Sequence, residues 1–288
     1  MRLRRLVAAL ACAAAPTLVS SNAAYAQTTP ERIVALSPFT ANTLAALGVT
    51  PIGIGQTLGG HDRLDPSLRG VTALPLSHPN GPNLEQLAAL NPQLVFSTPT
   101  WKRGAAAMRG LGMTVVESEP RTVAGVVDQT RRIGGLVGRP AEARELTSRI
   151  EKEIAAARRG IRTHPSVLLI VGVGRTPYAA LANSWGGDVI RQAGGRLLTR
   201  GLHASGGLAR ISNETVVDRD PDIIIAVPHG SAADIPKLAK YLRTNPAWRT
   251  TKAARDKRIY VSTDDSLLQA WPDPGRVIAT VRRSFLKN

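Results

Sequence analysis

Two tryptophans and a few basic side chains are the residues of this sequence best suited to hold a ligand. Trp101 is followed directly by Lys102 and Arg103, Trp185 lies in a second segment, and Arg175 follows a VGVG turn. Facing indole rings would offer broad apolar surfaces to a corrin, porphyrin or catechol ring. Neighbouring cations favour a carboxylate or another anion. The pattern predicts a site for an anionic, ring-bearing molecule, although each cation also fits an ordinary solvated surface.

Five histidines, at positions 61, 78, 164, 203 and 229, make a metal site one interpretation of the sequence. His61 and His78 flank a long loop in the first half, and Asp264 and Asp265 lie in the second half. Three nitrogens and a carboxylate would suit a transition metal. The spacing is irregular and no HxxxH pair occurs. Loop histidines are therefore the favoured interpretation, and neither a metal site nor a cofactor is predicted.

A secreted hydrolase is the enzymatic alternative. Ser37 and Ser184, together with several aspartates and histidines, could supply a catalytic triad. The sequence has no GxSxG motif for a nucleophile. The VGVG turn completes neither GxGxxG nor GxxxxGK[ST]. The sequence therefore predicts a binding protein and not an enzyme.

The first 26 residues have the features of a secretory signal peptide. A start with three arginines precedes an apolar stretch over 6–19, and Ala24-Tyr25-Ala26 is a small-x-small cleavage pattern. A membrane-spanning helix needs ~20 apolar residues, and Pro16 interrupts this shorter run. Cleavage after Ala26 would leave 288 − 26 = 262 residues without Cys12, the only cysteine. Export to the periplasm is expected.

The charge balance is strongly basic. The chain has 37 lysines and arginines against 21 acidic residues, a formal net charge of +16, or 16 − 3 = +13 without the leader's arginines. Such an excess could attract nucleic acid, anionic lipid or an acidic ligand. The arginines are scattered and no aromatic residues are interleaved with them. A solvated basic surface is preferred, with nucleic-acid binding kept as an alternative.

Short aliphatic runs alternate with helical patterns along the chain. This alternation predicts an α/β fold with mostly parallel sheets covered on both faces. The expected strands are 32–36, 51–55, 94–97, 114–116, 167–171, 223–227 and 259–261, with a hairpin-like extension at 178–181. The expected helices are 40–47, 84–90, 104–111, 123–136, 187–193, 213–217, 238–242 and 274–285. Residues 56–82 are expected to form a long glycine-rich loop.

A longer helix is predicted over 140–159. Pro140 suits a first helical turn, where its missing N–H has no partner in any case. Leu146, Ile150, Ile154 and Ile161 recur at helical spacing and form one apolar stripe. At 1.5 Å per residue, these 20 positions span roughly 30 Å. The length matches the width of a small domain.

Similar sequence lies on both sides of this helix. Glu85 precedes Pro92 by seven residues, Glu214 precedes Pro221 by seven, and an aliphatic run follows each proline. We interpret the chain as two like-built Rossmann-like lobes joined by one stiff helix. The predicted division is a signal peptide at 1–26, an N-terminal lobe at 27–138, a bridging helix at 139–162 and a C-terminal lobe at 163–288.

The ordered segments resemble one protein family. They are ERIVALSPFTANTLAALGVTPIGIG, NLEQLAALNPQLVFST, LGMTVVESEP, the long helix, ALANSWGGDVIRQAGG, ISNETVVDRDPDIIIAV and NPAWRTTKAARDKRIYV. Together they resemble the periplasmic substrate-binding proteins of iron-siderophore, haem and cobalamin ABC importers, over essentially the whole chain after the leader. The resemblance implies two α/β lobes bridged by one helix, a ligand held between them, and only small lobe closure.

The resemblance also implies residue roles. Glu85 and Glu214 match the family glutamates that pair with arginines of a dimeric inner-membrane permease, although each carboxylate also suits the positive end of its own helix. Trp101 matches a family position where an aromatic ring packs on the ligand, whereas Trp248 matches a structural segment and is expected in the core. The predicted ligand-binding set is Ser37, Phe39, Trp101, Lys102, Arg103, Arg175, Trp185 and Asp265.

The candidate cargoes are ranked by the charge of the predicted binding residues and by the positions at which the sequence departs from the family pattern. Lys102, Arg103 and Arg175 favour an anionic ferric siderophore. Asp264 or Asp265 matches a cobalamin-contacting aspartate, but no arginine stands four residues later, which disfavours cobalamin. Haem is disfavoured because no tyrosine falls on the relevant first-lobe loop. The predicted protein is a monomer that binds a metal chelate or tetrapyrrole and an ABC permease, without nucleic acid.

Overall fold

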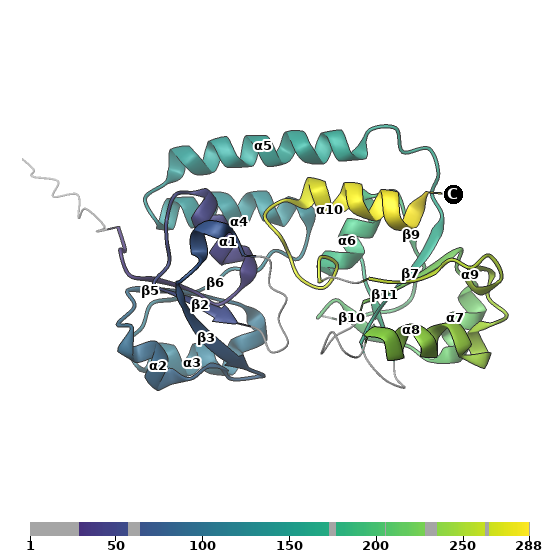
Figure 1. Cartoon of the computed structure of the whole chain (residues 1–288), viewed down its shortest axis with the longest axis horizontal. Helices are drawn as coiled ribbons and strands as arrows, with labels where there is room; N and C mark the ends of the chain where they lie inside the picture. The colour runs from purple at the N-terminus through teal and green to yellow at the C-terminus, as the bar shows by residue number, and fades with distance from the viewer. Residues whose placement is uncertain are drawn as a thin grey trace, which may run out of the picture.

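Two β-sheets, formed by separate halves of the chain, organise the computed structural model. The structure describes residues 29–56, 64–172, 177–204, 206–227, 235–262 and 265–287. In the described residues each sheet has six strands. A long helix lies along both halves (Figure 1). The predicted α/β class, with two lobes joined by one helix, is confirmed.

The first sheet is almost entirely parallel. Its strands are β1 (Ile33–Ala35), β2 (Gly53–Gln56), β3 (Thr72–Ser77), β4 (Gly81–Pro82), β5 (Leu94–Ser97) and β6 (Val115–Glu117), in the spatial order β4-β3-β2-β1-β5-β6. Only β4 is antiparallel to its neighbour. The helices of this half are α1 (Pro38–Ala46), α2 (Leu84–Ala89), α3 (Lys102–Gly110) and α4 (Val123–Leu136).

The second sheet repeats the design with a hairpin at one side. Its strands are β7 (Ser166–Val171), β8 (Tyr178–Ala180), β9 (Arg196–Leu197), β10 (Leu208–Arg210), β11 (Ile223–Val227) and β12 (Ile259–Val261). The strands β7, β11 and β12 are parallel, whereas β8 is antiparallel to β7 and β10. The helices are α6 (Trp185–Gln192), α7 (Asn213–Arg219), α8 (Ile235–Thr244), α9 (Lys252–Arg255) and α10 (Pro274–Val281). The antiparallel β8 confirms the predicted extension after β7.

The prediction of a loop over 56–82 is wrong. The strand β3 occupies residues 72–77 and pairs with β2 on one side and β4 on the other. Its burial alternates, with Leu74 and Leu76 in the core and their neighbours exposed. This alternation is the ordinary signature of a strand. Pro75 concealed it, because proline usually argues against a strand inside a sheet.

The helix α5 (Pro140–Arg158) confirms the long helix predicted between the halves. It lies against α4 in one half and against α10 in the other (Figure 1). Both contacts are close. A methyl group added to Gly134 of α4 would lie 2.3 Å from the Cβ of Ala143, and one added to Gly275 of α10 would lie 2.7 Å from the backbone of Glu153. Leu146 and Ile150 of α5 are buried beneath it.

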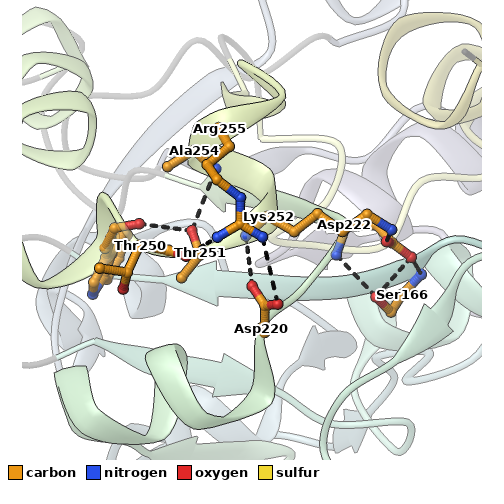
Figure 2. A network of polar contacts seen from close by, with 9 residues as sticks. Ser166, Asp220, Asp222, Thr250, Thr251, Lys252, Ala254 and Arg255 are labelled. Atoms are coloured by element: carbon orange, nitrogen blue, oxygen red, sulfur yellow. Dashed lines mark hydrogen bonds and ion pairs between the residues drawn. The ribbon is translucent and has the colours of Figure 1, made fainter.

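A polar network closes the amino ends of β7 and β11 (Figure 2). The Asp222 carboxylate accepts hydrogen bonds from the Ser166 backbone N–H at 2.7 Å and from its hydroxyl at 2.8 Å. Lys252 of α9 pairs with the other oxygen of Asp222, and its backbone N–H donates to Asp220 at 2.5 Å. The Lys252 ammonium is the main reason why the pKa of Asp222 falls to about 2. The network attaches α9 to two central strands.

Candidate functional site

Ligands of open parallel sheets are bound beyond the carboxyl ends of the strands. Most of the predicted site residues that the structure describes follow those ends, whereas Trp185 follows the antiparallel strand β8. Ser37 comes soon after β1, Trp101 follows β5, and Asp265 follows β12. Arg175 lies outside the described residues, as do Asp264, His61 and His229.

Ser37 and Phe39 hold the start of α1. The Ser37 side chain accepts a hydrogen bond from the backbone N–H of Thr40 at 3.2 Å and so caps the helix. The Phe39 ring is only 2% exposed and packs in the main hydrophobic core. Both side chains therefore have a structural function, and their contact with a ligand stays a prediction.

The expectation of two open tryptophan faces needs correction. Trp101 is 9% exposed and packs with Leu87 and Met108 in the core beneath α2 and α3. Trp185 is 4% exposed, and its indole N–H donates to the backbone oxygen of Ser266 at 2.8 Å. Burial of these large apolar rings stabilises the two halves. Trp248 is 1% exposed, which confirms its prediction as a core residue.

An exposed polar cluster surrounds the edge of Trp101. His78, Lys102 and Arg103 are all exposed, and the His78 ring meets the Trp101 ring edge-on with centroids 6.0 Å apart. Gly104 lies so close to the backbone oxygen of Asn80 that the start of α3 abuts the turn after β3. His78 therefore lies, through its contact with Trp101, near the start of the helix that carries Lys102 and Arg103. We call His78, Lys102 and Arg103 the basic cluster.

Sequence reasoning left His78 out of the ligand-binding set. The signal that could have included it is its position directly after β3, a strand that was itself missed. An imidazole can donate a hydrogen bond to an anion or bind a metal ion. In the described residues no group of three or more His, Cys, Asp or Glu side chains could hold a metal ion. The lysine and arginine of the basic cluster suit an anion, including the anionic ligands of a chelated metal.

At the strand ends of the second half, the described residues include Asp265 and Tyr241. Asp265 is half-buried, and its carboxylate accepts a hydrogen bond from the Gln269 side-chain amide. A small apolar crevice lies near the ends of β7 and β11, and Tyr241, 38% exposed, lines it together with Gly172 and Pro177. Its volume of about 10 Å³ holds roughly one water molecule. Tyr241 is thus an exposed aromatic residue that sequence reasoning did not place.

Glu119 is a third residue that sequence reasoning missed. It follows β6, where it is half-buried between the buried Ser118 and Pro120. Burial raises the pKa of its carboxyl, and the nearby Arg121 guanidinium opposes that shift. An acid at a strand end that resists ionisation is typical of a functional site or of a crowded helix entry.

Glu85 and Glu214 occupy equivalent places in the two halves. Each is exposed in the first turn of a short helix, after the capping residues Asn83 and Ser212. The Ser212 hydroxyl is the main cause that lowers the pKa of Glu214, followed by the residue's own backbone N–H. Their helices α2 and α7 lie on the side of the molecule opposite α5, one in each half (Figure 1). The helices that begin with these two glutamates therefore lie on one side of the molecule, one in each half.

A family model described as "Periplasmic binding protein" matches residues 33–266. The chain belongs to the periplasmic binding protein family. The match spans both sheets and α5. Proteins of this family bind solutes at the periplasmic or extracellular face of the membrane and are, in general, not enzymes.

Relatives of this periplasmic binding protein are named for different ligands. A protein of Halobacterium salinarum named "Cobalamin-binding protein" is 27% identical over 251 residues, which cover 85% of this chain and 67% of that protein. The solved ABC transporter substrate-binding protein of Listeria monocytogenes superposes with a TM-score of 0.79 at 21% identity, over 89% of this chain and 99% of that one. Staphylococcus aureus IsdE, solved in complex with heme, gives 0.75 at 23% identity, over 89% and 99%.

The likeness to the two solved structures shows the fold of this periplasmic binding protein. In the part of the chain that the structure describes, no helix combines the length and the apolar character needed to cross a bilayer. The predicted family is confirmed.

Proposed function

We propose that this periplasmic binding protein captures an anionic ferric chelate, a ferric siderophore, between its two lobes and delivers it to an ABC permease dimer in the inner membrane. The observation that supports this choice of cargo is the basic cluster. Its lysine, arginine and histidine side chains are all exposed near the strand ends of the first sheet. Charge-assisted hydrogen bonds from lysine and arginine suit the carboxylate, catecholate or hydroxamate oxygens of such chelates.

Haem and cobalamin are the alternative cargoes. Haem also fits the basic cluster, because His78 could bind its iron and the two cations could pair with its carboxylates. IsdE was solved with heme, and the Halobacterium relative is named for cobalamin. Cobalamin carries no comparable anionic rim and makes the least use of Lys102 and Arg103.

The test is a titration of the purified protein with a ferric hydroxamate, a ferric catecholate, hemin and cyanocobalamin, followed by tryptophan fluorescence. We expect saturable binding of a ferric siderophore. The double variant Lys102→Ala/Arg103→Ala should weaken that binding about tenfold or more, since hydrogen bonds to charged groups contribute ~1.5–3 kcal/mol. Arg109→Ala is the matched control, because Arg109 lies on the same helix but pairs with Glu117 at 3.6 Å.

Binding of hemin alone, with an axial-ligand spectrum that His78→Ala abolishes, would replace the siderophore by haem. Tight binding of cyanocobalamin alone, unaffected by loss of the cations, would contradict the assignment of the basic cluster.

Export and lobe division complete the proposal. We infer that residues 1–26 are removed as a signal peptide, that 27–138 and 163–288 form the lobes, and that 139–162 bridges them. Mass spectrometry of protein purified from the periplasm should give a chain that begins at Gln27. A start at residue 1 in that compartment would contradict the cleavage.

A further inference from the structure

A buried carboxylate joins the two halves of the molecule. Asp188 lies in α6 of the second half and is only 5% exposed. One of its oxygens, Oδ2, accepts a hydrogen bond at 2.8 Å from the backbone N–H of Val123, the first residue of α4. Val123 follows the last strand of the first sheet. The bond therefore connects residues 65 positions apart, in helices of different halves.

The geometry suits a strong interaction. The backbone N–H groups at a helix start have no partner within the helix, and the positive end of the helix dipole favours a carboxylate. The helix α4 has 14 residues. Its own Thr122 caps a different group, the N–H of Gly125, at 3.0 Å. The start of α4 is thus capped once from its own half and once from the other half.

The second oxygen of Asp188 is held within α6. Its Oδ1 lies 3.4 Å from the side-chain amide of Gln192 and 3.6 Å from the Arg191 guanidinium. These contacts orient the carboxylate toward α4. A buried charge needs such partners, because an unpaired one is costly to remove from water.

The position of this bond relative to α5 gives it a mechanical consequence. The helix α5 lies along one side of both halves and contacts α4 and α10. A contact along one side fixes the spacing of the halves there, but it leaves bending and twisting about α5 less constrained. The bond between Asp188 and α4 connects the halves at a second place, since α4 and α6 also contact each other.

We propose that Asp188 is a positioning residue that fixes the orientation of the second lobe relative to the first by capping α4 across the lobes. Its consequence for cargo affinity rests on the proposed function, whereas its effect on lobe orientation does not. Loss of the cap should widen the range of lobe orientations. It should therefore lower the affinity for a cargo that contacts both lobes.

The experiment measures distances between spin labels on the two lobes. The labels are placed at Ala88→Cys in α2 and Asp218→Cys in α7, both exposed positions, with Cys12→Ser in the full chain. We expect Asp188→Ala to broaden or shift the distance distribution. Thr122→Ala is the matched control: it removes the local cap of the same helix and should leave the distribution unchanged.

Asp188→Asn keeps an acceptor oxygen and is used as a second variant in case Asp188→Ala does not fold. It should keep the distribution narrow, while amide exchange at Val123 becomes faster by up to about tenfold, as expected for ~1.4 kcal/mol of lost bond strength. An unchanged distribution in Asp188→Ala, or unchanged Val123 exchange in Asp188→Asn, would overturn the proposal.

Cargo binding separates this proposal from the proposed function. A changed distribution in a protein that binds none of the ferric chelates would leave Asp188 its positioning role and remove the siderophore assignment. Unchanged distances in Asp188→Ala together with weakened siderophore binding would remove the positioning role of Asp188 and leave the siderophore assignment in place.

Discussion

Asp222 provides a residue-scale test of stability against pH. Its folded pKa of about 2 lies below the ordinary aspartate pKa of 3.8, chiefly because of the hydrogen bond from Lys252. A lowered folded pKa adds stability above pH ~4 that is lost as the pH falls toward 2. We expect Asp222→Asn to lower the free energy of unfolding by up to about 2 kcal/mol at pH 7.

Urea denaturation at pH 7 and at pH 2.5 checks this prediction. The difference between Asp222→Asn and the unmodified protein should shrink at the lower pH, because most of the stability that the lowered folded pKa adds is lost between pH ~4 and pH 2. Asp218→Asn is the control, since Asp218 is exposed in the same region. An equal difference at both pH values would mean that the carboxylate charge is not the cause.

Glu119 should behave in the opposite sense. Burial raises its folded pKa above 4.5, so ionisation costs stability as the pH rises through and above that value. We expect Glu119→Gln to raise the free energy of unfolding at pH 7 and to have little effect at pH 4. Thermal unfolding of Glu119→Gln and of the unmodified protein at both pH values measures this change in stability. A loss of stability at pH 7 would show that the ionised carboxylate has a favourable partner.

At the scale of elements, the close contact between α4 and α5 depends on one glycine. An added methyl group at Gly134 would lie 2.3 Å from the Cβ of Ala143, whereas one at the adjacent Gly135 would meet nothing within 4 Å. We expect Gly134→Ala to destabilise the fold by about 1–3 kcal/mol through overpacking. Gly135→Ala should stabilise it by up to ~1 kcal/mol.

Urea denaturation of the two single variants measures the difference, and the same substitution in neighbouring positions provides its own control. Equal effects would mean that α4 and α5 can separate without cost. The contact would then not hold the halves at a fixed spacing.

Most elements were predictable because their signals are local. The helix over 140–159, the aliphatic strands at 167–171 and 223–227, and the strand at 259–261 follow from periodicity and composition, and the structure has each within a residue. The short strands β9 and β10 and the short helix α9 were not predicted. Two to four residues carry too little pattern, and these elements exist because the sheets around them offer partners.

At the scale of the whole molecule, Glu85 and Glu214 test delivery of cargo separately from capture. We propose that both carboxylates pair with arginines of the permease. Charge reversal at both positions, Glu85→Lys/Glu214→Lys, should lower uptake in a reconstituted importer about a hundredfold, because juxtaposed like charges cost several kcal/mol. Cargo affinity should stay unchanged.

Glu145→Lys is the control for that experiment, since Glu145 is exposed on α5, on the opposite side of the molecule. Normal uptake by the double variant would contradict docking through these glutamates. Loss of cargo binding in the double variant would instead show that Glu85 and Glu214 contribute to binding of the cargo.

The sequence by itself determined the family, the two α/β halves, the helix between them and the placement of Glu85 and Glu214 at helix starts. These features depend on periodicity, capping and ordered segments, which are properties of neighbours along the chain. Only the tertiary structure decided that Trp101 and Trp185 are buried, that His78 lies against Trp101, and that Asp188 reaches α4. Burial and cross-lobe bonds depend on which distant surfaces meet, and no local pattern records that.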